Sequence, residues 1–323
     1  MKERFKKKKW ILLGILALLA GVLAGCAREG SQGPVRVGAL KGPTSMGLVF
    51  LMNDEERKEN YEFTMVTAAD ELMTQMVKGE LDIALIPANT AAILYQKTEG
   101  KIAAADINTL GVLYMVTGDA GIDRMEKLAG KTVYLTGKGT TPDYALQYLL
   151  DAYEVTGVTL EYKSEAAEVA AVLQSDPSAV GLLPQPFATA ACLQNENLQM
   201  TMDLTKIWDQ AQQGNGSRLV TGVTVVSRSF LKEHPDQVRA FLEDHKASAD
   251  QINGDPDGGA ALVVAAGIVE KEPIARQAIP RCNITCITGE EMKTALEGYL
   301  ETLYELNPES VGGSLPQEDF YFV

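Results

Sequence analysis

One short stretch of sequence occurs twice in this chain, and its repetition constrains the fold more than any single motif does. The first copy is VRVGALKGPT at residues 35–44, and adding 97 to each residue number gives TVYLTGKGTT at residues 132–141. Both copies have the pattern of an apolar strand, a Lys-Gly turn and the start of a helix. The offset continues without a gap to the pair Pro87 and Pro184. Self-similarity at one offset predicts two lobes of similar build.

Strand-like and helix-like segments alternate within each copy. We expect strands at 61–66 and 81–86 with a helix at 70–77 between them, and the second copy repeats this order with strands at 160–163 and 179–183. A strand followed regularly by a helix is typical of parallel α/β sheets. The predicted fold class is therefore α/β, with two lobes that each contain a mainly parallel sheet flanked by helices.

Two further apolar runs of strand length, at 109–117 and 219–227, flank the second copy. No Gly/Pro-rich linker accompanies them. They are therefore the expected connections through which the chain leaves one lobe and returns to it, and thus the candidate hinge. From residue 229 onward the apolar spacing predicts a mainly helical segment.

The N-terminal segment differs in kind from the rest. Lys2, Arg4 and the lysines at 6–9 precede an apolar stretch that ends in LAGC at 23–26. The apolar stretch is shorter than the roughly 20 residues that a spanning helix needs. This order resembles a bacterial lipoprotein signal over residues 1–25, with Cys26 carrying the lipid. An ordinary signal peptide with an incidental cysteine is the alternative. We expect a protein tethered outside the cytoplasm, with residues 26–34 as a flexible leash.

Charge excludes some classes of partner. The formal net charge is −14, and removing residues 1–25 takes away six basic residues and one acid, which leaves −19. A strongly acidic protein is a poor match for nucleic acid or for an anionic membrane surface. With 46% hydrophobic and 22% charged residues, the chain has the composition of a compact globular protein.

The cysteines and histidines give no sign of a metal site. Both histidines lie among charged residues, which favours exposed positions on helices, and no metal or cofactor is expected. A disulfide between the last two cysteines stays open, because a turn would bring them together and an extended RCNITCI stretch would not. No nucleophile has a nearby histidine, so an enzyme is not expected. The residues concerned are Cys192, Cys282, Cys286, His234 and His245.

Four strand-to-helix turns, at 42–46, 87–90, 139–143 and 184–187, are the candidate ligand-binding segments. In open parallel sheets, ligands bind beyond the carboxyl ends of the strands, where helix N-termini present free N–H groups. Small polar side chains in such turns either cap the helices or contact the ligand. Because they come from equivalent turns of both copies, they favour a shared cleft: Thr44, Ser45, Asn89, Thr90, Thr140 and Thr141.

Taken in order, the motifs LAGC, KGPTSMG, KGELDIALIPANTAAIL, TGKGTTPDYAL and LLPQPF resemble those of ABC-transporter solute-binding lipoproteins of the type II periplasmic-binding-protein fold. The chain is most similar to the nitrate, sulfonate, taurine and thiamine-precursor group, called SsuA/THI5-like or NMT1-like. The resemblance implies one lobe of residues 35–113 plus 222–323 and an inserted lobe of 114–221, which close on a small solute. It also implies a monomer that delivers the solute to a membrane permease driven by a cytoplasmic ATPase. The implied ligand contacts add Met46, Tyr114, Gln185 and Trp208 to the set above, with Trp208 alternatively a core residue.

The class of ligand is less constrained. Helix N-termini with Ser and Thr suit a sulfonate-type oxyanion, yet no turn carries an arginine and Asp143 would oppose an anion. This balance favours a neutral or partly cationic heterocycle such as a vitamin precursor. Two other interpretations stay open, namely a lipoprotein that senses a solute and an enzyme of the same fold of the pyrimidine-synthase or menaquinone-pathway kind. In every case residues 41–46 and 138–143 should face each other across one cleft.

Overall fold

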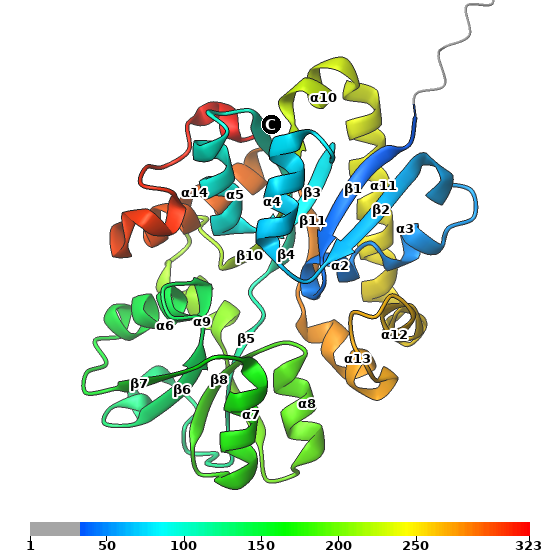
Figure 1. The fold of residues 1–323 in the computed structure, drawn as a ribbon. Helices are drawn as coiled ribbons and strands as arrows, with labels where there is room; N and C mark the ends of the chain where they lie inside the picture. The colour runs from blue at the N-terminus through cyan, green and yellow to red at the C-terminus, as the bar shows by residue number, and fades with distance from the viewer. Residues whose placement is uncertain (1–32) are drawn as a thin grey trace, which may run out of the picture. The chain divides into compact units, whose positions relative to one another are not determined.

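The computed structural model describes residues 33–323, so the predicted lipoprotein signal and Cys26 lie outside the described residues. The chain divides into residues 1–34 and a second unit of residues 35–323. It contains two β-sheets (Figure 1). Sheet A has the strand order β11 (Ile284–Ile287), β4 (Ile102–Leu110), β10 (Val220–Ser227), β3 (Ile83–Pro87), β1 (Val35–Leu40) and β2 (Tyr61–Val66). Sheet B has the order β7 (Thr159–Lys163), β6 (Thr132–Thr136), β8 (Val180–Pro184), β5 (Leu113–Thr117) and β9 (Gln199–Asp203).

Helices cover both faces of each sheet. On sheet A, one face packs against α4 (Ala69–Lys78), α5 (Ala88–Lys97) and α14 (Gly289–Leu306), and the other against α3 (Val49–Asn53), α10 (Arg228–Glu233) and α11 (Pro235–Gly254). On sheet B, one face packs against α6 (Thr141–Ala152) and α9 (Leu204–Ala211), and the other against α7 (Ala166–Ser175) and α8 (Phe187–Gln194). We call sheet A with its helices the sheet-A part, and sheet B with its helices the sheet-B part.

Short helices complete the structure. A small apolar cluster joins α2 (Pro43–Met46), α12 (Pro256–Ala265) and α13 (Glu272–Ala278) to α11, so these helices belong to the sheet-A part. Five 3₁₀ turns are η1 (Lys58–Asn60), η2 (Met125–Leu128), η3 (Ile279–Arg281), η4 (Pro308–Val311) and η5 (Glu318–Phe320). Within residues 33–323, no helix is both long enough and apolar enough to cross a membrane.

The predicted α/β class with two similar sheets is confirmed, and the sequence offset reappears in the structure. The bounds of β3 and β8, and those of α4 and α7, differ by the same 97 residues as the sequence copies. Under this offset β2, β1, β3 and β4 of sheet A correspond to β7, β6, β8 and β9 of sheet B, and β10 and β5 occupy the same place in the two strand orders without sharing the offset. The sheets are mixed rather than mainly parallel, because β10 and β5 pair antiparallel with both of their neighbours while the repeated strands pair in parallel.

The prediction of one continuous strand at 109–117 is wrong. β4 ends at Leu110 in sheet A, and β5 begins at Leu113 in sheet B, so the apolar run is shared by two sheets with different partners. Gly111 lies between them. A Cβ there would stand 2.3 Å from the Thr205 hydroxyl oxygen and 2.7 Å from a methyl carbon of Leu219. The two connections between the sheets therefore run side by side, at a point where only glycine fits.

The expectation of exposed histidines also fails at one position. His245 on α11 is fully buried, because α11 packs across sheet A and this side chain points at Asp106 of β4. The neighbouring Glu243 and Lys246 are exposed, so the charges around His245 in the sequence did not reveal that its own side chain faces the core. His234 is half-buried between α10 and α11. Cys192, Cys282 and Cys286 are free thiols, so the possible disulfide is not formed.

Candidate functional site

The first predicted turn, at 42–46, is closed by its own side chains. The Thr44 hydroxyl donates a hydrogen bond to the carbonyl of Leu40 at 3.0 Å, and the Ser45 hydroxyl donates to the carbonyl of Gly42 at 3.1 Å. Thr44, Ser45 and Met46 are all buried, and Met46 packs in the apolar cluster of α2, α12 and α13. These three residues therefore shape the turn, and the hydroxyl protons of Thr44 and Ser45 are already bonded within it.

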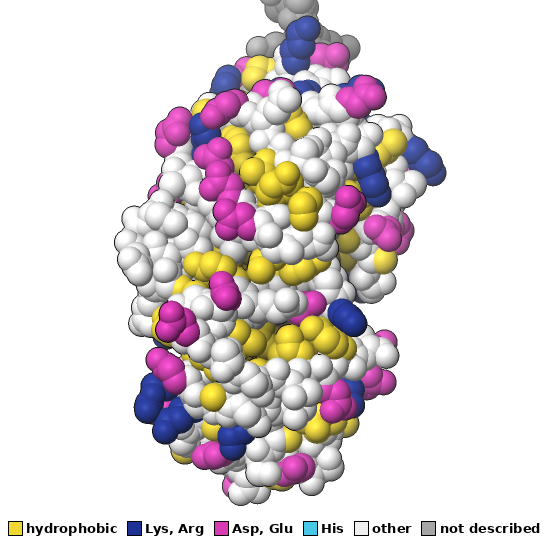
Figure 2. Space-filling model, turned by 90° about the vertical axis from the view of Figure 1, so that its left-hand side faces the viewer, with side chains coloured by type: hydrophobic (Ala, Val, Ile, Leu, Met, Phe, Trp, Pro, Cys, Tyr) yellow, Lys and Arg dark blue, Asp and Glu magenta, His cyan; other side chains and the backbone are white. Residues whose placement is uncertain are grey.

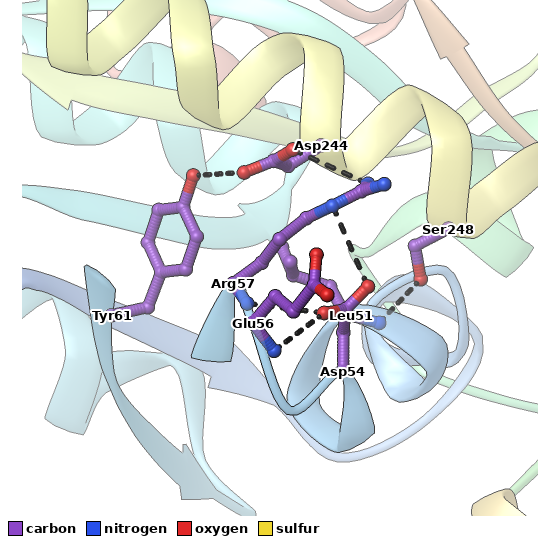
Figure 3. A network of polar contacts seen from close by, with 7 residues as sticks. All are labelled: Leu51, Asp54, Glu56, Arg57, Tyr61, Asp244 and Ser248. Atoms are coloured by element: carbon purple, nitrogen blue, oxygen red, sulfur yellow. Dashed lines mark hydrogen bonds and ion pairs between the residues drawn. The ribbon is translucent and has the colours of Figure 1, made fainter. Parts of the chain in front are cut away.

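The segment that follows this turn is fixed to α11 by a polar network (Figure 3). The Ser248 hydroxyl accepts the backbone N–H of Leu51 at 3.1 Å, and the Asp244 carboxylate accepts from Tyr61 at 2.7 Å and from Arg57 at 3.4 Å. Burial and the bond to Asp244 raise the pKa of Tyr61 well above its usual value. Because α3 continues directly from α2, this network also holds the turn in place.

The turn at 139–143 lies against the sheet-A part. Thr140 is exposed and donates to the carbonyl of Gly137 at 2.6 Å, whereas the Thr141 hydroxyl accepts from the Tyr299 hydroxyl of α14 at 3.2 Å. Thr141 is the first residue of α6, and Tyr144 of this helix accepts a hydrogen bond of 2.7 Å from Asn307, the residue that follows α14. This turn is therefore at a junction between the two parts.

An internal carboxylate occupies the N-terminus of α6. Asp143 is buried and accepts from the backbone N–H of Gly139 at 2.8 Å, from Tyr162 at 2.7 Å and from Gln147 at 2.6 Å. The ammonium of Lys138 lies 5.4 Å from the centre of the Tyr162 ring. A helix N-terminus favours negative charge, and here Asp143 supplies it. An anionic ligand at this turn would meet a carboxylate already in position.

The two remaining turns, at 87–90 and 184–187, differ in whether their polar side chains form hydrogen bonds within the protein. Asn89 and Thr90, in the first turn of α5, are half-buried and their side chains form no hydrogen bond within residues 33–323. Gln185 is buried, and its amide oxygen accepts from Thr189 at 2.7 Å. Phe187, the first residue of α8, is 42% exposed, which is unusual for a large aromatic side chain. Asn89 and Thr90 therefore keep polar groups available, and Phe187 offers an apolar surface that the sequence did not single out.

Tyr114 of β5 and Trp208 of α9 both contact the sheet-A part. The Tyr114 hydroxyl donates to the carbonyl of Arg281 at 3.0 Å, and burial raises the pKa of this tyrosine. Trp208 is fully buried, with ring centres 4.5 Å from Tyr148 and 5.7 Å from Tyr299, and its indole N–H has no hydrogen-bond partner in the described chain. Trp208 thus packs inside the junction between α6, α9 and α14.

The structure brings three of the predicted residues, Thr141, Trp208 and Tyr114, to two junctions between the parts. One consists of α6 and α9 against α14, and the other of β5 and α8 against η3 and α13. In residues 33–323 no hydrogen bond or ion pair joins turn 42–46 to turn 139–143, so their facing each other stays a prediction. Figure 2 shows apolar side chains gathered in bands across the middle of one face. A cavity of about 300 Å³ lies elsewhere, between η2, β9 and α9, and none of the predicted ligand residues lines it.

The strand order, the repeated halves and the paired turns define the class of type II periplasmic binding proteins, the fold predicted from the sequence. An ABC transporter from Parabacteroides distasonis has a similar structure, with a TM-score of 0.78, 25% identity and coverage of 90% of this chain and 99% of that one. The sulfonate-binding protein SsuA from Escherichia coli has a TM-score of 0.69 at 15% identity, covering 89% of this chain and 93% of its own. The alkanesulfonate-binding SsuA from Xanthomonas axonopodis pv. citri, bound to MOPS, has a TM-score of 0.58 at 12% identity, with coverage of 88% and 95%.

A family model places the chain more narrowly within this fold. The family described as "Menaquinone biosynthesis" matches residues 36–305, and the chain belongs to this family. Among curated proteins, a search by similarity finds no match.

Proposed function

We propose that this protein is the extracytoplasmic solute-binding component of an ABC importer. In this proposal a small molecule binds between the sheet-A and sheet-B parts and is passed to a permease in the membrane. The observation that carries the proposal is that both sheets have equivalent strand-to-helix turns. The two sheets are joined by two connections that lie next to each other. The similarity to the Parabacteroides distasonis ABC transporter, at 25% identity over 90% of this chain, supports it.

The ligand that we propose is a neutral or partly cationic heterocycle rather than a sulfonate. Asp143 already holds the N–H of Gly139, and the hydroxyl protons of Thr44 and Ser45 are bonded within their own turn. An oxyanion would need several free donors. Asn89 and Thr90 offer hydrogen bonds of both polarities, and Phe187 offers an aromatic face for a ring.

The lipid anchor belongs to the same proposal. Cys26 within LAGC would carry the lipid, and the protein would then stay at the outer face of the cytoplasmic membrane. Metabolic labelling with a fatty acid should mark the wild-type protein and leave Cys26→Ala unmarked. A Cys26→Ala variant that still carried the label would rule out this attachment site.

The binding proposal is tested by a thermal-shift screen of the full chain against sulfonates, nitrate, thiamine pyrimidines, flavins and nucleobases. A true ligand at 100 times its Kd adds about 2.7 kcal/mol to the free energy of unfolding. For the compound found, we expect Asn89→Ala to weaken affinity by about tenfold, the effect of about 1.4 kcal/mol in lost hydrogen bonding. Lys97→Ala, at the exposed far end of α5, is the matched control and should bind normally. Equal affinity in both variants would remove Asn89 from the site.

A second candidate function, an enzyme of the menaquinone pathway, is favoured by the family match over residues 36–305. The two functions differ in what happens to the bound compound. Incubation of each stabilising compound with the protein, followed by mass spectrometry, should return the compound unchanged if the protein is a carrier. Conversion of a bound compound into a product would support the enzyme and overturn the carrier proposal.

A further inference from the structure

Three side chains of kinds that bind metal ions lie together inside the sheet-A part, away from the four candidate turns. Asp106 of β4 and His245 of α11 are fully buried, and Cys286 of β11 is half-buried. The His245 Nδ1 atom is 3.1 Å from the Asp106 Oδ2 atom, and the Cys286 Sγ atom is 3.8 Å from the same oxygen. One ligand atom from each residue lies within 4.8 Å of the other two.

The fold holds this cluster from three separate directions. Pairing of β11 with β4 brings Cys286 beside Asp106, and α11 packs against β11 and reaches Asp106 of β4 through His245. The hydroxyl of Thr224 on β10 donates to the Asp106 Oδ1 atom at 2.9 Å. This bond fixes the carboxylate so that its other oxygen, Oδ2, points at the imidazole and the thiol. The arrangement is therefore set before any ion binds.

Packing alone does not account for these residue types. Burying a carboxylate and an imidazole costs more than burying apolar groups of similar size, unless every polar atom is paired. Here only the Nδ1 atom of His245 is paired, with Asp106, while the Nε2 atom on the other side of the ring is buried and has no hydrogen-bond partner in the described chain. That atom faces Gly47, where a Cβ would stand only 3.1 Å away.

We propose that Asp106, His245 and Cys286 bind a zinc ion. Zinc binds nitrogen and oxygen at about 2.0–2.2 Å and sulfur at about 2.3 Å, so tetrahedral ligand atoms lie about 3.3–3.6 Å apart. The two observed distances, 3.1 and 3.8 Å, are close to this spacing. Three protein ligands leave a fourth position for water. The site is independent of the proposed solute-binding function.

The charges balance when zinc binds. The Cys286 S–H bond breaks, its proton leaves to solvent, and a Zn–S bond forms. His245 binds through Nδ1, so the proton that its hydrogen bond to Asp106 requires moves to Nε2, and Asp106 binds as a carboxylate. One carboxylate and one thiolate cancel the two positive charges of the ion, so the buried site carries no net charge.

Zinc has a route to this site along the edge of the sheet. β11 is a short edge strand, and its register with β4 shifts between Ile284 and Ile287, the stretch that contains Cys286. An irregularly paired edge strand opens more readily than a central strand. Local opening at Cys286 would admit the ion without unfolding the sheet-A part.

The test uses the purified full-length protein, stripped with a chelator and dialysed against zinc or cobalt chloride. We expect about one zinc per chain by elemental analysis, and a thiolate-to-cobalt charge-transfer absorption in the cobalt form. Cys286→Ser should lose this absorption and at least tenfold in zinc affinity. Cys192→Ser, a change at a half-buried thiol on α8, is the matched control and should keep both.

Two results would overturn the site. The first is a wild-type protein that retains no zinc and shows no thiolate-to-cobalt absorption, a measurement that needs no variant to fold. The second is zinc bound equally by Cys286→Ser and the wild type. Since no solute is added, these outcomes are separate from the success or failure of the ligand screen.

Discussion

At the scale of single residues, the polar side chains in the candidate turns are largely committed to the protein itself. Thr44, Ser45 and Asp143 each complete hydrogen bonds inside their own turn or helix start. For Thr44 and Ser45 the sequence left capping and ligand contact open, because both uses select the same residue types. The choice depends on partners far away in sequence, such as Tyr162 for Asp143.

Replacing the buried carboxylate of Asp143 tests whether its hydrogen bonds stabilise the folded protein. Asp143→Asn puts an amide NH₂ where one oxygen accepts hydrogen bonds, so at least one donor among Gly139, Gln147 and Tyr162 loses its partner. We expect the free energy of unfolding to fall by about 1–3 kcal/mol in urea titrations. Asp151→Asn, at an exposed position on the same helix, should change it by less than about 0.5 kcal/mol. Equal effects of the two changes would argue against the buried network.

At the scale of helices and strands, the sequence predicted well whatever depends on local pattern. The paired bounds of α4 and α7 follow from an offset visible in the sequence. The sequence-based prediction of one strand was wrong where an apolar run is divided between two sheets, as at Leu110 and Leu113. Hydrophobicity alone does not indicate which strand a residue pairs with. The prediction failed at His245 for a related reason, since burial there depends on how α11 crosses sheet A.

The close contact between the two connections at Gly111 can be tested by substitution. Gly111→Ala places a methyl group 2.3 Å from the Thr205 hydroxyl oxygen and 2.7 Å from Leu219, so one of these side chains must move. We expect a loss of about 1–3 kcal/mol in the free energy of unfolding, measured by chemical denaturation. Gly254→Ala, where nothing lies within 4 Å, is the control and should be neutral or slightly stabilising. A neutral Gly111→Ala would mean that the two connections are not in contact.

At the scale of the whole molecule, buried tyrosines make the folded state sensitive to alkali. Burial is the largest cause that raises the pKa of Tyr61, Tyr114, Tyr299 and Tyr321 above the usual 10.0. Since the folded-state pKa lies above the unfolded one, this contribution to stability is complete below about pH 10. It is lost as the pH rises, because the unfolded chain ionises first.

Urea titrations between pH 8 and 11 check this sign. We expect the free energy of unfolding to decline above about pH 10, by about 1.4 kcal/mol per pH unit for each tyrosine that stays protonated only in the folded state. Tyr299→Phe removes one such group and should make the decline shallower by about that amount. A decline of unchanged steepness in Tyr299→Phe would show that Tyr299 ionises equally in both states.

The adjacency of Gly111 and Leu219 has a mechanical consequence. Two backbones of fixed length pass between the sheets at one place, so in the proposed solute capture any rotation of the sheet-B part would pivot there. Displacement in such a lever grows with distance from the pivot. Residues beside the pivot, such as Asn283, which donates to the Gly111 carbonyl, should stay almost still while the outer helices travel furthest. Spectroscopic labels intended to follow solute capture therefore belong on α7 and α12, not near the pivot.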